Sequence, residues 1–178
     1  MTDLYTTTVP PFIKALDNLS KILDKAAAHA AGKATERRPA AYFERALLND
    51  CLIFDQFPLL MQVQRVSDNA KGGPARLAGI EGPKMEDAET TIAELKDRLA
   101  KTAAFLKTLT PEQFVGSEER KIELPYWKGK YLTGFEYATV YLVPNFYFHY
   151  ATAYSILRKN GVDVGKDDYI GNVPLKEL

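Results

Sequence analysis

The 178-residue chain is poor in the side chains that most enzymes use for chemistry: it has one cysteine, Cys51, one tryptophan, Trp127, and two histidines, His29 and His149. A lone cysteine excludes an internal disulfide framework and fits a reducing compartment. The chain has no apolar run of the roughly 20 residues that a membrane-spanning helix needs, and its first residues lack the pattern of a secretory signal. We therefore expect a soluble protein of the cytoplasm, with the nucleus as the alternative.

An excess of charge of one sign is missing too. Lysine and arginine number 23, aspartate and glutamate also number 23, and the basic residues are dispersed apart from short pairs such as Arg37 and Arg38. Because binding to nucleic acid or to an anionic membrane depends on a positive field, the composition predicts neither partner. Phosphate-binding glycine motifs are absent, since Gly72, Gly73 and Gly79 do not have the required spacing.

Helical periodicity is the strongest pattern that the chain does contain. Apolar residues recur at spacings of three and four over residues 5–31, from 59 toward 77, and over 87–109. In the third of these segments the charged residues predict a solvated face, made of Glu94, Lys96, Asp97, Arg98 and Lys101. With 46% hydrophobic residues, the chain is long enough for one good core and too short for two ordinary domains, so we expect one domain over residues 1–178.

Proline and glycine mark the expected boundaries of these segments. Asp55 is a candidate N-cap for the second helix, with Pro58 in its first turn. The run of Gly72, Gly73 and Pro74 predicts a kink or a break in the same helix. Alternation over residues 119–133 predicts a small β-hairpin that turns at Lys128 and Gly129.

Residues 141–161 form the most aromatic part of the chain. Pro144 suits the first turn of a helix, and Gly161 suits the position just after its end. The helix between them is apolar nearly all round, so we expect it to be buried on several sides. Asn145 and His149 share one of its faces, with Thr152 one turn further. This polar line on an apolar helix is the candidate site.

Four long helices with short connections predict an all-α fold, an up-down four-helix bundle with a small β-hairpin before the last helix. The alternative is a larger, irregular all-α fold in which residues 39–57 supply an extra helix.

Two stretches resemble a domain family of unknown function within the DinB/YfiT-like superfamily of four-helix bundles. They are FPLLMQVQRVSDNAKGGPARLAG in the second long helix and PNFYFHYATAYSILRKNGVDVGKDDYIG near the end of the chain. The resemblance covers nearly the whole chain, and it implies a DinB-like fold and dimers.

The resemblance also implies where a metal would bind. Metal-binding members of the superfamily use one histidine on the second helix and an HxxxH pair on the fourth. By that resemblance His149, which precedes Leu157 and Arg158, stands at the second position of the pair, and Asn145 stands at the first. Asp68 is the loose match for the ligand on the second helix. Two of the three imidazoles are therefore replaced.

Asp68, Asn145 and His149 together offer one carboxylate, one amide and one imidazole, a set that would hold a divalent transition metal only weakly. We favour a degenerate metal site instead, with no cofactor, in which Asp68 pairs with His149, holds one imidazole tautomer and raises the imidazole pKa.

These expectations favour a metal-free, non-enzymatic protein that binds a small molecule or a protein partner. Its pocket candidates are Asp68, Asn145, His149, Thr152 and Tyr154. The alternative is a metal-dependent enzyme of the thiol-transferase or isomerase type with the altered ligand set. The tyrosines of the last helix exceed what one helix can bury inward, so we also expect a homodimer packed partly through this helix.

Overall fold

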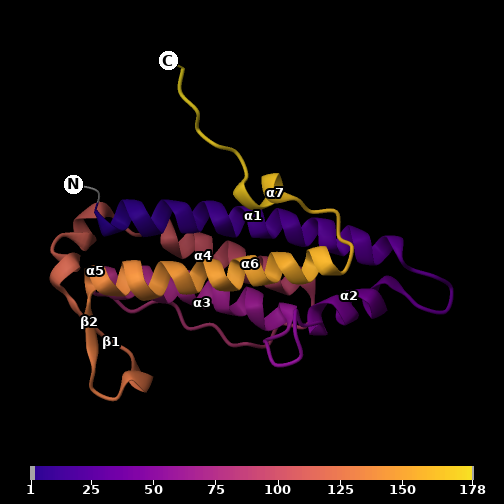
Figure 1. Cartoon of the computed structure of the whole chain (residues 1–178), viewed down its shortest axis with the longest axis horizontal. Helices are drawn as coiled ribbons and strands as arrows, with labels where there is room; N and C mark the ends of the chain where they lie inside the picture. The colour runs from indigo at the N-terminus through magenta and orange to yellow at the C-terminus, as the bar shows by residue number, and fades with distance from the viewer. Residues whose placement is uncertain (1–2, 178) are drawn as a thin grey trace.

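The computed structural model describes residues 3–177 and has a bundle of four long helices, with shorter elements at its ends (Figure 1). The long helices are α1 (Leu4–Gly32), α3 (Leu59–Ala78), α4 (Ile92–Leu106) and α6 (Val143–Lys159). Two short helices accompany them, α2 (Ala40–Asn49) between α1 and α3, and α7 (Lys166–Ile170), which packs on α1. The predicted all-α bundle is confirmed, and α2 is the additional helix that the alternative fold contained.

The segment between α4 and α6 is built from short elements. In chain order they are η1 (Pro111–Phe114), η2 (Ser117–Glu119), β1 (Lys121–Glu123), η3 (Pro125–Trp127), β2 (Tyr131–Thr133), α5 (Gly134–Glu136) and the π-helical turn η4 (Tyr137–Leu142). Strands β1 and β2 pair antiparallel, with Ile122 opposite Leu132. The predicted hairpin is therefore confirmed, and its turn lies where Lys128 and Gly129 both have positive φ.

Helix α4 begins later than its apolar periodicity indicated. The predicted helix over residues 87–109 is observed only over Ile92–Leu106. Thr91 caps the helix by accepting a hydrogen bond from the Glu94 backbone N–H, and the Glu94 carboxylate accepts one from the Thr91 N–H in return. This capping box starts the helix at Ile92 and leaves Asp87 in the preceding connection.

Helix α3 runs without interruption through Gly72, Gly73 and Pro74, so of the predicted kink or break the break is wrong. Pro58 is itself the N-cap residue, whereas Asp55 is exposed in the preceding loop and caps nothing. A Cβ at Gly73 would lie 2.2 Å from a methyl group of Leu142, so this glycine allows the turn η4 to approach α3 closely. The glycine therefore serves helix packing, and the tertiary contacts keep the helix intact.

Helix α3 is the most enclosed of the long helices. The sequence had predicted that α6 would be buried on several sides. Every residue from 59 to 75 is buried or half-buried, because α3 packs against α4 and α6 and also contacts α1 and α2. In α6, by contrast, Pro144, Phe148 and Ala151 are exposed. The apolar character of α6 therefore exceeds what the single chain buries.

The four long helices share one hydrophobic core, in which the ring of Phe12 on α1 stacks on Phe146 of α6 at 4.0 Å. Over residues 3–177, no helix combines the length and apolar character that crossing a membrane requires.

Candidate functional site

A buried pair of polar side chains joins α3 to α6. The Nδ1 atom of His149 lies 2.7 Å from Oε1 of Gln62, and the two side chains are 8% and 1% exposed. The Gln62 Nε2 atom donates to the backbone carbonyl of Phe57 at 3.0 Å. His149 is therefore tied through Gln62 to the chain just before α3.

These contacts set the tautomer and the charge of His149. Because Gln62 uses its amide N–H toward Phe57, its oxygen faces the imidazole and Nδ1 must carry the proton. Burial lowers the pKa of His149, and the positive charge of Arg65 lowers it further. The imidazole is therefore neutral near pH 7, with its lone pair on Nε2. The predicted rise in pKa is wrong because no carboxylate holds the ring.

A second polar pair lies on the same interface. The Asn145 Nδ2 atom donates to Oδ1 of Asn69 at 2.9 Å, and Nδ2 of Asn69 donates to the Arg65 carbonyl at 2.8 Å. With the first pair it forms an amide–imidazole cluster of Gln62, Asn69, Asn145 and His149. The cluster joins two antiparallel helices through neutral groups.

The other pocket candidates on the last helix make contacts of their own. The hydroxyl of Thr152 donates to the Phe148 carbonyl at 2.7 Å, within α6. The hydroxyl of Tyr154 lies 3.5 Å from the Val164 carbonyl. Neither hydroxyl is hydrogen-bonded to the His149–Gln62 pair within residues 3–177, so the polar side chains from Asn145 through Thr152 do not form one hydrogen-bonded network.

Asp68 belongs to a different cluster and makes no hydrogen bond to His149 within the part of the chain described. Its carboxylate accepts from Arg98 at 2.7 Å and from Lys71 at 2.8 Å. Burial opposes ionisation of Asp68, but the hydrogen bond from Lys71 and the positive charges around the carboxylate outweigh it and hold its pKa below the ordinary value. The expected Asp68–His149 pair is therefore not formed.

Arg98 is the centre of that second cluster. It is 2% exposed and reaches Asp87 at 2.9 Å and Glu89 at 3.0 Å in addition to Asp68. It also donates to the Glu86 carbonyl at 2.9 Å. The prediction that Arg98 belongs to a solvated face is thus wrong. The guanidinium fastens the connection before α4 to both α3 and α4.

The residues at the DinB-like metal position do not fit a transition metal. The amide–imidazole cluster offers one imidazole, and its other polar groups are amides that are already engaged: Asn145 bonds Asn69, and Gln62 bonds His149. Asp68, the one carboxylate predicted as a ligand, is neutralised by cations. Among residues 3–177, no three His, Cys, Asp or Glu side chains gather as a metal would require. Zinc sites are built from such groups, so these residues would not hold the ion firmly.

Gln62 and Asn69 are the site residues that the sequence reasoning missed. They lie seven residues apart, which is two turns of helix, and so share one face of α3. The available signal was a pair of amides two turns apart on one face of an amphipathic helix.

Known proteins support the same assignment of fold. The crystal structure of a DinB family member protein from Shewanella denitrificans is similar, with a TM-score of 0.89 and 46% sequence identity over 98% of this chain and 96% of that chain. None of the curated proteins matches the chain. The family model described as "Domain of unknown function (DUF1993)" matches residues 4–170. The chain therefore belongs to the DUF1993 family, a DinB-like family of unknown function.

Proposed function

We propose that this protein is a metal-independent interaction protein that works as a homodimer, with the outer face of α6 joining the two copies. We define the outer α6 face by four residues: Pro144, Phe148 and Ala151 of α6, and Val140 of the turn η4 that leads into it. All four are exposed, Val140 by 71% and Phe148 by 52%. No Asp, Glu, Lys or Arg occurs from residue 137 to 157. This exposed, apolar and uncharged face is the observation that carries the proposal.

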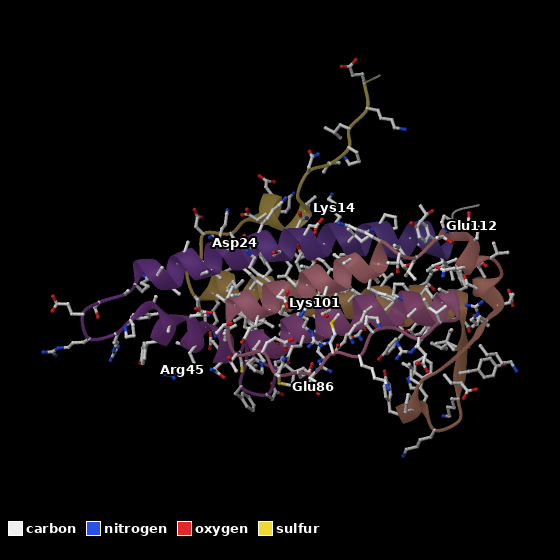
Figure 2. All side chains as sticks on the ribbon, turned by 180° about the vertical axis from the view of Figure 1, so that it is seen from behind. Lys14, Asp24, Arg45, Glu86, Lys101 and Glu112 are labelled. Carbon is white, nitrogen blue, oxygen red and sulfur yellow. The ribbon has the colours of Figure 1, made fainter. Side chains whose placement is uncertain are left out.

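The other long surface helices do not share this character. Helix α1 exposes Asp17, Lys21 and Asp24, and α4 exposes Asp97 and Lys101; Asp24 and Lys101 are visible from behind in Figure 2. A helix whose outer side meets water carries such charges, whereas an apolar outer side marks a contact surface. The difference argues that a partner covers α6.

The loop before α3 extends the outer α6 face. The loop is held beside the C-terminal half of α6, because Lys159 donates to the Cys51 carbonyl at 2.5 Å. Four large side chains of the loop are exposed: Leu52 by 42%, Ile53 by 51%, Phe54 by 91% and Phe57 by 46%. The loop is thus joined to the end of α6, and we include its exposed apolar side chains in the proposed contact region.

The size and charge of this region suit a second copy of the chain. An aromatic side chain has about 150–250 Å² to bury, so the exposed parts of these eight side chains come to several hundred Å². This is on the order of the 800 Å² per partner that a stable interface buries. In a two-fold dimer the same patch meets itself, and the four residues of the outer α6 face, which are all uncharged, meet no charge repulsion from their own copies.

Substituting Phe148→Glu tests the dimer. We expect the wild type to sediment as a dimer at micromolar concentration, and the dimer dissociation constant of the variant to rise by about a hundredfold or more, because the substitution buries two unpaired carboxylates. Analytical ultracentrifugation measures both species.

Val115→Glu is the matched control, because Val115 is 80% exposed but lies outside the region. It should leave the dimer intact. Circular dichroism verifies that each variant is folded. A monomeric wild type, or a Phe148→Glu protein that dimerises as tightly as the wild type, would refute the proposal.

Substituting His149→Ala tests whether a metal takes part. We expect no stoichiometric metal in either protein when it is purified without chelator and measured by elemental mass spectrometry. We expect the free energy of unfolding to fall by about 1–3 kcal/mol, because the buried Gln62 oxygen loses its donor. His29→Ala is the control, since His29 is half-exposed at the end of α1. Stoichiometric Zn, Ni or Fe that disappears in His149→Ala would instead favour the metal-dependent enzyme.

The same variant has a pH signature. The folded-state pKa of His149 is lowered, so the unfolded chain takes up this proton first as the pH falls below about 6.5. The stabilising effect of the neutral ring is therefore complete above that pH and is lost as the pH falls toward the folded-state pKa. The melting temperature of the wild type should decline more steeply over this interval than that of His149→Ala.

A further inference from the structure

The hairpin carries an unusual concentration of positive and aromatic side chains. It projects from the bundle below α5 in Figure 1. Residues 120–131 include four basic side chains and one acidic one, although the whole chain has no net charge. The tip also holds Tyr126, Trp127 and Tyr131, of which Tyr126 is 62% and Tyr131 49% exposed. Exposed rings interleaved with lysines are typical of surfaces that bind planar anions.

These side chains surround a hollow. Its volume is about 590 Å³, and it is lined by Tyr126, Trp127, Lys128, Lys130, Tyr131 and Leu132. Small-molecule sites have volumes of roughly 300–1,000 Å³, apolar or aromatic walls and a few polar groups. Here half of the lining residues are aromatic, and Lys128 and Lys130 are its charged residues.

The aromatic walls are anchored to the bundle. The ring of Trp127 meets Tyr141 edge-on at 5.4 Å, and the hydroxyls of Tyr126 and Tyr141 are 2.6 Å apart. Tyr141 belongs to the π-helical turn η4, and such turns recur at functional sites. Because η4 leads directly into α6, the rings are held in place before a ligand arrives.

The backbone at Lys128 is strained. With φ of +52°, Lys128 is the one non-glycine residue among residues 3–177 that has positive φ. It precedes Gly129, whose φ is +79°. Asparagine or glycine would adopt this turn conformation more easily, whereas a lysine there costs on the order of 1 kcal/mol. A lysine in a strained position beside a hollow indicates that its ammonium group is used.

We propose that the hairpin tip binds a nucleotide, with the base against the rings of Trp127 and Tyr131 and the phosphate beside Lys128 and Lys130. The base is the planar ring that aromatic side chains stack on, and the phosphate is the anion that lysine pairs with. The nucleotide comes either free in solution or as one unit of a single strand. Basic residues elsewhere in the chain are dispersed, so they do not form a continuous positive surface along which a long nucleic acid could bind. The site shares no residue with the outer α6 face, so it does not depend on the dimer.

Trp127 provides the measurement, because it is the single tryptophan of the chain. Its fluorescence is followed while adenosine monophosphate, adenosine, inorganic phosphate or a short oligothymidylate is added to the full-length protein. We expect a saturable change with adenosine monophosphate and a weaker response to adenosine or phosphate alone. The double variant Lys128→Gln, Lys130→Gln should raise the dissociation constant about tenfold or more, which corresponds to loss of two charge contacts.

Lys107→Gln is the control, because Lys107 is exposed at the end of α4 and does not line the hollow. This variant should bind the nucleotide as the wild type does. Lys128→Asn distinguishes a loss of binding from a loss of stability. It removes the charge of Lys128 while it relieves the backbone strain at this position. We expect this variant to bind weakly while its melting temperature stays equal or rises.

The two nucleotide sources give different results. Tighter binding of the oligothymidylate than of the mononucleotide identifies a single strand as the source, and the reverse order identifies a free nucleotide. A wild type whose fluorescence does not saturate with either would overturn the proposal. So would a double variant that binds as tightly as the wild type.

Discussion

Replacing Arg98 with methionine should lower the free energy of unfolding by about 3 kcal/mol and the melting temperature by roughly 10 °C. Methionine keeps an unbranched apolar side chain in place of the arginine stem but leaves Asp68, Asp87 and Glu89 without the cation that they share. Arg98 is 2% exposed, so water cannot replace it easily. Thermal unfolding followed by circular dichroism measures the loss.

The pH dependence of the stability lost in Arg98→Met tests whether the loss comes from the carboxylates around Arg98. Burial opposes ionisation of Glu89, but hydrogen bonds from Gln64 and Arg98 outweigh it, so its pKa, like that of Asp68, lies below the ordinary value in the folded protein. The stabilising effect of these carboxylates is present above about pH 4 and is lost as the pH falls through their folded-state pKa. The gap in melting temperature between wild type and Arg98→Met should therefore narrow below about pH 4.

Lys101→Met is the matched control on the same helix. Lys101 pairs with Asp97 at 2.6 Å, but both side chains are more than 60% exposed. Exposed pairs contribute about 0–1 kcal/mol, so this variant should remain close to the wild type. Equal losses in the two variants, or a gap that is independent of pH, would contradict the role of Arg98.

Substituting Gly134→Ala should also destabilise the protein strongly. A Cβ at this position would lie 1.8 Å from the backbone carbonyl oxygen of Ser117, so α5 and η2 must move apart. Overpacking costs about 1–3 kcal/mol, and we expect the upper end because backbone atoms form the obstacle. The displaced α5 leads into η4, where Tyr141 supports Trp127. The fluorescence of Trp127 should therefore change together with the melting temperature.

Gly32→Ala is the control for this substitution. Gly32 is the last residue of α1, and a Cβ there would meet nothing within 4 Å. It should be neutral or slightly stabilising, because alanine favours a helix more than glycine does. A Gly134→Ala protein with the melting temperature and fluorescence of the wild type would show that the close contact is not required.

The long helices and the hairpin could be predicted from the amino-acid sequence alone. Their signals are local: apolar residues at spacings of three and four, and alternation between Lys121, Ile122 and Glu123. Turn residues were equally informative, since Gly161 after α6 has the positive φ that its position predicted. Features of this kind depend on neighbours in the chain and therefore need no knowledge of the fold.

Which side chains meet in the interior of the bundle depends on how the helices pack, and the sequence did not predict it. Arg98 looked like part of a solvated face because its neighbours Asp97 and Lys101 are charged. Its partners Asp68 and Glu89 come from other segments, and only packing brings them to it. Likewise, α6 was expected to be enclosed because it is apolar, but α3 is the helix that the others surround most completely. The local sequence pattern does not show which apolar surface another segment will cover.

The candidate site shows the same division. Asn145 and His149 were recognisable as a polar pair on an apolar helix, but their partners depend on how α3 is rotated against α6. Successive residues of a helix differ by about 100°, so Asp68 lies far around the helix from both Gln62 and Asn69. The rotation that turns these two amides toward α6 directs Asp68 toward Arg98 on α4. The sequence thus identified the polar residues of α6. The way α3 packs against α6 determines that their partners are the neutral side chains of Gln62 and Asn69.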